Sequence, residues 1–256
     1  MLNESNGVFA ASFVLPQAEA DNSGRVGVPA LAALCQEAAG RHAAAMGLGI
    51  ADVLENNQAW FLLRMYLELE RQPQAGQTLA IRTWPCRMKA GTTKRDFCLA
   101  DSTGTPLGRA TSLWAIVDLQ TRHMLAAGPW LAEQVRQCPE SVLAFPGRPR
   151  GGPEHDCTNR CTVLARRADL DIHGHVNNIR ILEWGLAAVP GAVRDQRLAS
   201  AVDIVFKQEC RDGDRIQVAA GEPSPGYWHY TLEREQDGST VAVMQTWWRM
   251  KDNFAS

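Results

Sequence analysis

The sequence predicts an α+β fold built from two similar halves, each a long helix wrapped by an antiparallel sheet. Three observations support this prediction. The chain repeats its own pattern at an offset of 150 residues, each half places one helix before several alternating strands, and the 256 residues, 45% of them hydrophobic, are enough for two ordinary cores. A single helix that covers one face of hairpin-connected strands is an α+β arrangement.

The repeat is clearest at the start of each half. Three residues of the first half align with three of the second, Asp21, Gly24 and Val26 with Asp171, Gly174 and Val176. A helix rich in Ala and Leu is predicted at 29–46, and its partner at 178–188. A short strand precedes each helix, at 13–15 and at 161–164.

The segments after the two helices alternate hydrophobic and polar residues, as half-buried strands do. Turns that contain Gly or Pro separate them, which indicates hairpins. The predicted strands lie at 67–70, 78–83 and 110–117 in the first half and at 203–209, 215–219 and 241–250 in the second. Each half is therefore expected to hold a short strand, then one long helix, and then three or four antiparallel strands.

A stretch rich in Pro and Gly, PESVLAFPGRPRGGP at 139–153, separates the two halves. Such a composition opposes regular secondary structure and is typical of a linker. We therefore predict an N-terminal domain at 1–138, a linker at 139–153 and a C-terminal domain at 154–256.

Charge and composition argue against several classes of protein. The formal net charge of −2 lacks the basic excess of a general nucleic-acid binder. No stretch approaches the roughly 18 apolar residues that a membrane span needs, and the first residues do not resemble a secretory signal. The seven cysteines are scattered and odd in number, so neither a disulfide framework nor a zinc site is indicated. We expect a cytoplasmic protein.

Three short blocks of sequence carry most of the functional information. They are RATSLW at 109–114 followed by DLQTR at 118–122, DLDIHGHVNN at 169–178, and KQEC at 207–210. In this order and spacing they resemble the acyl-acyl carrier protein (acyl-ACP) thioesterases, in the form of a bacterial-type relative of the plant fatty acyl-ACP thioesterases. The resemblance covers nearly the whole chain.

The resemblance implies a tandem (double) hotdog fold and a thioester hydrolase. The implied substrate is a fatty acyl chain on the phosphopantetheine of acyl carrier protein, and the implied products are free fatty acid and holo-ACP, in fatty acid biosynthesis and lipid metabolism. No metal and no organic cofactor is implied. The N-terminal domain is expected to form the acyl-chain pocket and the C-terminal domain the catalytic site.

The resemblance also implies a catalytic set of Asp, Asn, His and Glu, or of the Cys beside that Glu. Carried onto this chain, the set is Asp171, His173, His175 and Glu209, with Cys210 as the less favoured alternative. The family's Asn is His173 here, and a neutral imidazole still offers one donor and one acceptor for positioning a substrate.

The first half keeps only part of this pattern. It has Asp21, but Ser23 and Arg25 stand where the second half has its two histidines. We therefore expect the first half to be catalytically silent and to shape the acyl tunnel.

Thioester hydrolysis needs an oriented water, a base and donors for the developing oxyanion. We expect Glu209 and His175 to activate the water, while Asp171 and His173 position the reactants. Direct attack by Asp171 through an anhydride stays open as a variant. The oxyanion donors are expected among N–H groups near the positive end of the second half's helix. The residues that carry them are Gly174, Val176 and Asn177.

Several of these residues also have purely structural interpretations. Asp171 suits a helix cap or an Asx turn, and Asn177 and Asn178 suit capping and turn positions. If the segment were extended, residues 171, 173 and 175 would share one side, where three such side chains form a possible metal site.

Glu209 and Cys210 are neighbours, so a regular strand would point them to opposite faces. Alternation then places Cys210 in the core and favours Glu209 as the catalytic group, unless a bulge reverses the pattern. The same alternation puts Cys210 with Ile204 and Phe206, and Glu209 with Asp203 and Lys207.

Two further groups of residues are assigned to substrate binding. The acyl pocket is expected to include large side chains of the first half, namely Trp60, Met65, Trp84, Met88 and Trp114. The carrier protein is acidic, so a basic rim at the pocket mouth would speed association. We assign Lys89, Lys94 and Arg95 to this rim.

Three other functions stay open. An acyl-CoA thioesterase of the same fold would share the motif, and a non-catalytic acyl-thioester-binding protein would bind without turnover. A hotdog dehydratase would share the acid–base residues but not the three blocks. Release of free thiol separates an enzyme from a binding protein. The sequence is compatible with a monomer or a homodimer, and it does not set the preferred chain length.

Overall fold

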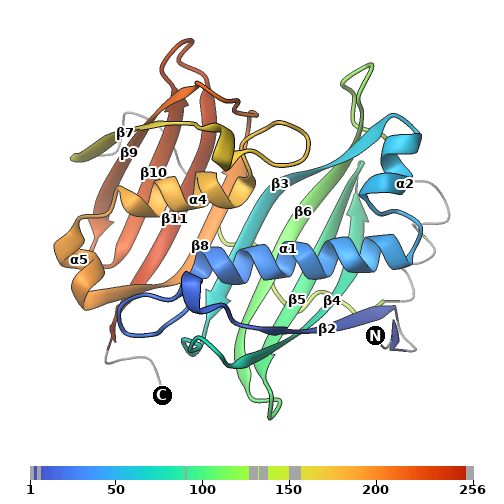
Figure 1. Ribbon diagram of the computed structural model, residues 1–256, viewed down its shortest axis with the longest axis horizontal. Helices are drawn as coiled ribbons and strands as arrows, with labels where there is room; N and C mark the ends of the chain where they lie inside the picture. Colours follow the sequence, from blue (N-terminus) through green and yellow to red (C-terminus); the bar gives the residue numbers. More distant parts are fainter. Residues whose placement is uncertain are drawn as a thin grey trace. The chain divides into compact units, whose positions relative to one another are not determined.

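The computed structural model describes residues 3–4, 7–89, 91–126, 132, 138–149 and 157–251. The chain forms two compact units, the first ending at Phe145 and the second beginning at Pro146 (Figure 1). This division falls inside the predicted linker 139–153, whose residues 150–153 lie outside the described residues. The outermost residues of both predicted domains, at 1–2 and 252–256, also lie outside them.

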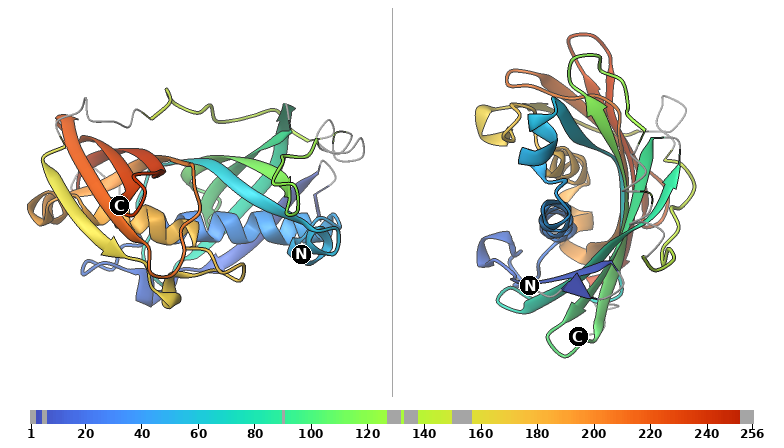
Figure 2. Two further views of the ribbon diagram at one scale, coloured as in Figure 1. Left: turned by 90° about the horizontal axis from the view of Figure 1, so that it is seen from above. Right: turned by 90° about the vertical axis from the view of Figure 1, so that its right-hand side faces the viewer.

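The first unit is a curved antiparallel sheet with one long helix on its concave face (Figure 2). Its strands occur in the order β1-β2-β4-β5-β6-β3. They are β1 (Asn3–Glu4), β2 (Val8–Val14), β3 (Gln58–Leu69), β4 (Thr78–Lys89), β5 (Thr92–Asp101) and β6 (Pro106–Asp118). The helices are α1 (Val28–Ala45) and the short α2 (Ile50–Glu55), and a 3-10 turn, η1, covers Gln17–Glu19.

The second unit repeats this plan. Its strands occur in the order β8-β11-β10-β9-β7. They are β7 (Asn159–Leu164), β8 (Arg197–Phe206), β9 (Arg215–Ser224), β10 (Tyr227–Arg234) and β11 (Thr240–Met250). The helices are α4 (Asn178–Ala187) and α5 (Gly191–Gln196), and the 3-10 turn η2 covers Arg167–Asp169.

The two sheets have the same topology. Counted from the strand before the long helix, the first runs β2-β4-β5-β6-β3 and the second β7-β9-β10-β11-β8. This confirms the repeat predicted from the sequence and the α+β arrangement of each half. Most strands are longer than predicted; β3, for example, begins at Gln58, where buried and half-buried residues do not alternate regularly. Three strands stop earlier than predicted, β2 at Val14 rather than at 15, β3 at Leu69 rather than at 70 and β8 at Phe206 rather than at 209.

Small residues let each helix lie close to its sheet. The buried face of α1 is largely alanine, with Ala32 and Ala38 at 0% exposure. In α4, a Cβ added to Gly185 would meet the Cε of Met244 in β11 at 2.4 Å, so this position has no room for a side chain. Asn177 caps α4, accepting a hydrogen bond from the N–H of Ile179 at 2.8 Å.

A buried polar pair joins α1 to the first sheet. His42 of α1 is 2% exposed, and its Nδ1 accepts a hydrogen bond from Nη1 of Arg95 in β5 at 3.0 Å. Arg95 also donates to the Oγ1 of Thr83 at 3.2 Å, and Phe9 stacks on the imidazole with ring centres 5.3 Å apart. Burial, followed by the Arg95 charge, lowers the pKa of His42 to about 3.

We expect this pair to make the protein less stable in acid. An unfolded His42 gains a proton near its ordinary pKa of 6.5, whereas the folded one stays neutral down to a pKa of about 3. The unfolded state therefore binds more protons in this window, and the free energy of unfolding falls as the pH drops below 6.5. The loss attributable to His42 is about 2 kcal/mol at pH 5.

Urea unfolding at pH 7.5 and pH 5 would measure this loss. His42→Gln keeps an acceptor for Arg95 but does not titrate, so its stability is expected to change less between the two pH values. Equal changes in both proteins would show that His42 is not responsible.

The start of the predicted linker is bound to the outer face of the first sheet. Oδ2 of the buried Asp96 accepts hydrogen bonds from Ser141 Oγ at 2.8 Å and from the N–H groups of Val142 and Leu143 at 2.8 and 3.2 Å. Lys94 Nζ lies 3.2 Å from Asp96 Oδ1 and also donates to the carbonyl of Leu143. This part of the linker is therefore an ordered element of the first unit.

All seven cysteines are free thiols. Within the described residues, no helix is both long and apolar enough to cross a membrane.

Candidate active site

The DLDIHGHVNN block forms a closed loop before α4. The Asp171 carboxylate accepts hydrogen bonds from the N–H groups of His173 at 2.8 Å and of His175 at 3.2 Å. The Asp171 N–H donates to the His175 carbonyl at 2.7 Å, and Gly174 turns the chain with φ 77°. The segment is therefore a tight Asx turn rather than an extended strand.

The first unit contains the same loop. Asp21 Oδ1 accepts hydrogen bonds from the N–H groups of Ser23 at 2.8 Å and of Arg25 at 3.0 Å, and Gly24 has φ 78°. This copy holds its shape without either histidine. The structural interpretation of Asp171 is thus confirmed, since its carboxylate shapes the loop that presents His175.

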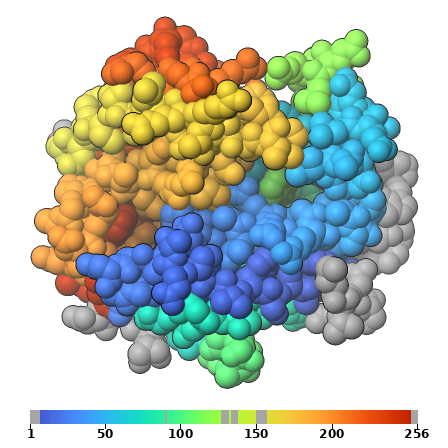
Figure 3. Space-filling view, in the orientation of Figure 1, coloured from blue at the N-terminus to red at the C-terminus, as the bar shows by residue number. Residues whose placement is uncertain are grey.

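The loop brings His175 to Glu209. His175 Nε2 lies 3.2 Å from Glu209 Oε2, and the two side chains are 23% and 28% exposed. The Val176 N–H also donates to the carbonyl of Cys210 at 2.8 Å, which ties the two sequence blocks together beside this contact. The pair can reach water and can exchange a proton, as acid–base chemistry requires. The loop lies at the surface of the second unit, next to β7 (Figure 3, yellow).

Glu209 and Cys210 do not lie in a strand, so the predicted alternation does not apply to them. Strand β8 ends at Phe206, so both residues lie in the loop between β8 and β9. Asp203, which alternation grouped with Glu209, is fully buried. The conclusion about Cys210 still holds for another reason. The thiol is at 0% exposure, and burial is the main cause that raises its pKa to about 11, so it stays protonated at neutral pH.

His173 does not join the pair. Its side chain is exposed, and its N–H is used by the Asx turn. Over the ranges that the structure describes, its imidazole takes part in no hydrogen bond or ion pair. The turn also removes the geometry behind the metal alternative, and no three His, Cys, Asp or Glu side chains of the described residues gather as a metal site would require.

The predicted oxyanion donors are already used by the fold. The N–H of Gly174 donates to the Asp171 carbonyl, that of Val176 to Cys210, and that of Asn177 to the Asp169 carbonyl. This corrects the prediction for Gly174, Val176 and Asn177, because a committed N–H is not available to a substrate. One neighbour differs, since the N–H of Asn178, the first residue of α4, has no hydrogen-bond partner among the described residues.

Most of the predicted pocket residues share one face of the first sheet. In the strand register Met65 pairs with Ser112, and Ser112 with Arg95, whose side chain reaches α1. Paired residues of antiparallel strands point to the same face. This face therefore carries four of the predicted residues, Trp60, Met65, Met88 and Trp114. Trp84 instead pairs with Asp96 on the outer face. The prediction that Trp84 lines the acyl pocket is therefore wrong.

The predicted basic rim does not form. Arg95 is 7% exposed and bonds to His42 beneath α1, while Lys94 is 13% exposed and pairs with Asp96 on the opposite face. Neighbours in a strand point to opposite faces, so these two cannot share a rim. Of the three residues assigned to the carrier protein, Lys89 alone is exposed.

The first unit also reveals a residue that sequence reasoning missed. The Val26 N–H donates to the Pro73 carbonyl as the Val176 N–H does to Cys210, so Pro73 corresponds to Cys210 and Gln72 to Glu209. Gln72 Nε2 donates to the Val26 carbonyl at 2.7 Å. The first unit thus has an amide where the second has a carboxylate.

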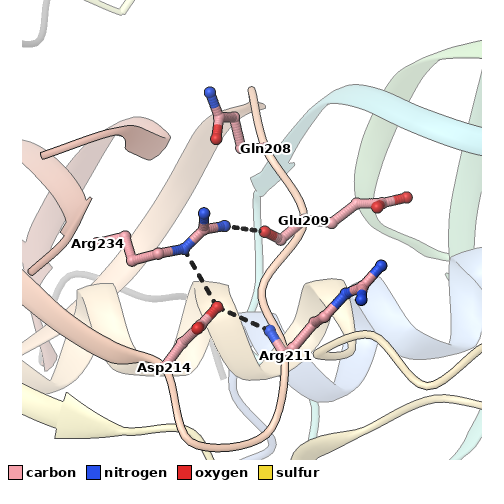
Figure 4. Close-up of a pocket in the computed structure, with 5 residues that line it drawn as sticks. All are labelled: Gln208, Glu209, Arg211, Asp214 and Arg234. Carbon is pink, nitrogen blue, oxygen red and sulfur yellow. Dashed lines mark hydrogen bonds and ion pairs between the residues drawn. The ribbon is translucent and has the colours of Figure 1, made fainter. Parts of the chain in front are cut away.

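A polar cavity of about 390 Å³ borders Glu209 on its main-chain side (Figure 4). Arg234, the last residue of β10, donates to the carbonyl of Glu209 and forms an ion pair with Asp214 at 3.2 Å. Arg234 is a second residue that the motifs did not indicate, since it lies outside all three blocks. The residues that line the cavity are Gln208, Glu209, Arg211, Asp214 and Arg234.

Comparison with known families gives two matches that together cover most of the chain. Residues 6–129 match the acyl-ACP thioesterase N-terminal domain, and residues 154–250 match the acyl-ACP thioesterase C-terminal domain.

Two curated relatives of similar sequence come from plants. One is oleoyl-acyl carrier protein thioesterase 1 of Arabidopsis thaliana, 29% identical over 84% of this chain and 64% of the relative. Another is the dodecanoyl-[acyl-carrier-protein] hydrolase of Cinnamomum camphora, 27% identical over 96% of this chain and 69% of the relative. The chain thus spans roughly two thirds of the length of these relatives.

Two solved structures superpose over almost the whole chain. An acyl-ACP thioesterase from Bacteroides thetaiotaomicron has a TM-score of 0.86 and 27% identity, covering 97% of this chain and 100% of the other. The 12:0-ACP thioesterase from Umbellularia californica has a TM-score of 0.84 and 21% identity, covering 95% and 98%. The second likeness bears on the fold alone.

Proposed function

The chain belongs to the acyl-ACP thioesterase family, and from this membership we propose that it hydrolyses fatty acyl-ACP thioesters to free fatty acid and holo-ACP. The predicted tandem hotdog fold is confirmed by the superpositions with family members. The observation that carries the proposed reaction is the 3.2 Å contact between His175 Nε2 and Glu209 Oε2.

The proposed reaction uses Glu209 as the base. Its carboxylate takes a proton from water, and the oxygen of that water attacks the carbonyl carbon of the thioester. When the tetrahedral intermediate collapses, the C–S bond breaks and His175 donates a proton to the leaving thiolate of phosphopantetheine. The proton held by Glu209 then passes across the 3.2 Å contact to His175, which restores both groups.

Asp171 and the N–H of Asn178 support this reaction without taking part in proton transfer. Asp171 positions His175 through the Asx turn, and we prefer the water route because direct attack by Asp171 would disturb those hydrogen bonds. The N–H of Asn178 at the start of α4 replaces the three predicted oxyanion donors. It lies at the positive end of a helix of 10 residues.

The two units would have different roles, catalysis and substrate binding, as the sequence predicts. The second unit would be catalytic, because it holds His175 and Glu209. The first would be silent and would form the acyl pocket, because Arg25 and Gln72 stand at the equivalent positions. The four pocket residues on its α1-facing side and the exposed Lys89 remain predictions, and seven free thiols support a reducing cytoplasmic setting.

Thiol release from acyl-ACP and acyl-CoA of several chain lengths tests the proposal. We expect turnover of acyl-ACP with a higher kcat/KM than for the matching acyl-CoA. A higher kcat/KM for acyl-CoA would instead identify an acyl-CoA thioesterase. Binding of acyl-ACP without thiol release would identify a binding protein, and His173 would then be the first position to change, to the family's Asn.

A further inference from the structure

Glu209 lies in a loop that no regular strand pairing holds. The loop spans residues 207–214, between β8 and β9. At its start, the N–H groups of Lys207 and Gln208 donate to the Val241 carbonyl, and at its end Asp214 Oδ2 accepts from the N–H of Arg211 at 2.9 Å. In the middle of the loop, the Cys210 carbonyl accepts a hydrogen bond from the Val176 N–H at 2.8 Å, and the Glu209 carbonyl beside it accepts one from a side chain.

Arg234 provides that side chain. Its Nη2 donates to the carbonyl oxygen of Glu209, its Nε lies 3.2 Å from Asp214 Oδ2, and its Nη1 donates to Asp237 at 3.0 Å. Asp214 in turn holds Arg211, so one guanidinium connects the middle of the loop with its end (Figure 4). The side chain is 19% exposed, which shields these contacts in part from water.

The Arg234 contacts bear on the main chain of Glu209 and not on its carboxylate. Figure 4 shows the Glu209 side chain pointing away from the guanidinium, while the carbonyl points toward it. The Glu209 side chain makes its 3.2 Å contact with His175 through Oε2. From this arrangement we propose that Arg234, supported by Asp214, is a positioning residue that holds the Glu209 carboxylate against His175.

This proposal rests on the proposed function, and it predicts a loss in kcat. Without Arg234 the carbonyl of Glu209 loses its donor, and the loop is free to shift. Misplacing a catalytic group by about 1 Å costs up to about 10²-fold in rate. Substrate binding involves other parts of the protein, so KM is expected to change little.

The guanidinium of Arg234 stays protonated over the pH range in which the activity is measured. Burial alone would lower the pKa of its guanidinium, but Asp214 and Asp237 raise it above its ordinary value. A change in the pH dependence of kcat after substitution would therefore report on Glu209 and His175.

The first unit supplies a matched control. Arg71 lies directly before Gln72 in the equivalent loop, and it donates from Nη2 to Asp101 at 3.0 Å and from Nε to the Pro106 carbonyl at 3.0 Å. Its side chain is 24% exposed, close to the value for Arg234. Arg71→Met thus removes a similar carboxylate-and-carbonyl contact from a loop that carries no catalytic group.

The experiment compares Arg234→Met, Arg71→Met and Asp214→Asn in the full-length protein with acyl-ACP as substrate. We expect Arg234→Met to lower kcat by about 10- to 100-fold with KM within about 3-fold, and Asp214→Asn to lower kcat in the same direction but less. Arg71→Met should keep kcat within about 2-fold, even though thermal unfolding shows a similar loss of stability for both arginine variants.

Arg234→Met combined with Glu209→Gln provides the decisive readout. If Arg234 acts through Glu209, its loss costs less than about 3-fold when Glu209 is already inactive. The same 10- to 100-fold loss in both backgrounds, or an unchanged kcat in Arg234→Met, would overturn the proposal.

Two further outcomes keep the test interpretable. If Arg234→Met does not fold, Arg234→Lys keeps the charge beside Asp214 but cannot also reach the Glu209 carbonyl, and kcat is expected to fall while stability is largely retained. Full activity in a folded Arg234→Lys would contradict the positioning role. No thiol release by the intact protein would overturn the proposed function itself, and the positioning role with it.

Discussion

Glu209→Gln is expected to lower kcat for acyl-ACP by about 10²- to 10⁴-fold, the usual contribution of a general base. The amide keeps the shape of the side chain and a contact with His175, but it cannot take a proton from water. The first unit holds the natural counterpart of this substitution, because Gln72 stands there in the position of Glu209. Thiol release under saturating acyl-ACP measures the effect, and KM should change little.

Glu183→Gln is a suitable control for this result. Glu183 lies on α4, is 30% exposed against 28% for Glu209, and pairs with Arg180 at 2.7 Å. Its kcat should stay within about 2-fold of the intact protein. A Glu209→Gln protein that keeps more than a tenth of the activity would show that another group removes the proton. Because His175 and Glu209 act as a unit, adding His175→Ala should cost little more.

The second large effect concerns stability. Asp96→Ala is expected to lower the free energy of unfolding by about 3–5 kcal/mol. Asp96 is fully buried, and its carboxylate serves Thr111 Oγ1 at 2.6 Å, Lys94 at 3.2 Å and three donors of residues 141–143. Removing it leaves a largely buried ammonium without its carboxylate, and the N–H groups of Val142 and Leu143 lose their acceptor. Urea unfolding at neutral pH measures the loss.

Asp118→Ala is the control that shows how much stability is lost when an aspartate outside this buried network is removed. Asp118 sits at the end of β6 and accepts hydrogen bonds from turn N–H groups, those of Gln120 at 2.9 Å and Thr121 at 2.7 Å. We expect a much smaller loss of stability there, because these hydrogen bonds are exposed to water. Limited proteolysis of Asp96→Ala should also show faster cleavage near residues 141–145. A loss below about 1 kcal/mol would mean that the linker is held by other contacts.

Much of the fold was predictable because it depends on local patterns. The alignment of Asp21 with Asp171 located two loops whose hydrogen bonds prove equivalent, and the alternating segments located the strands. The His175–Glu209 pair was also predictable, since the three motif blocks named both residues. A duplicated sequence pattern strongly indicates a duplicated fold, because both copies must allow the same packing of helix and sheet.

The errors arose where partners come from distant parts of the chain. Nothing near Val176 in the sequence shows that its N–H group is taken by the carbonyl of Cys210. The end of β8 at Phe206 depends on where its partner β11 stops pairing. The basic rim fails for a local reason, because Lys94 and Arg95 are adjacent in a strand and their side chains point to opposite faces.

The contacts between Asp96 and residues 141–143 also determine where this protein can be recombined with its relatives. A chimera whose crossover lies at 138 would inherit Asp96 from one parent and its partners from the other. A crossover after Phe145 keeps the carboxylate and its donors from the same parent, and it coincides with the division between the two compact units. The inherited module is therefore longer than the first domain's regular strands and helices suggest.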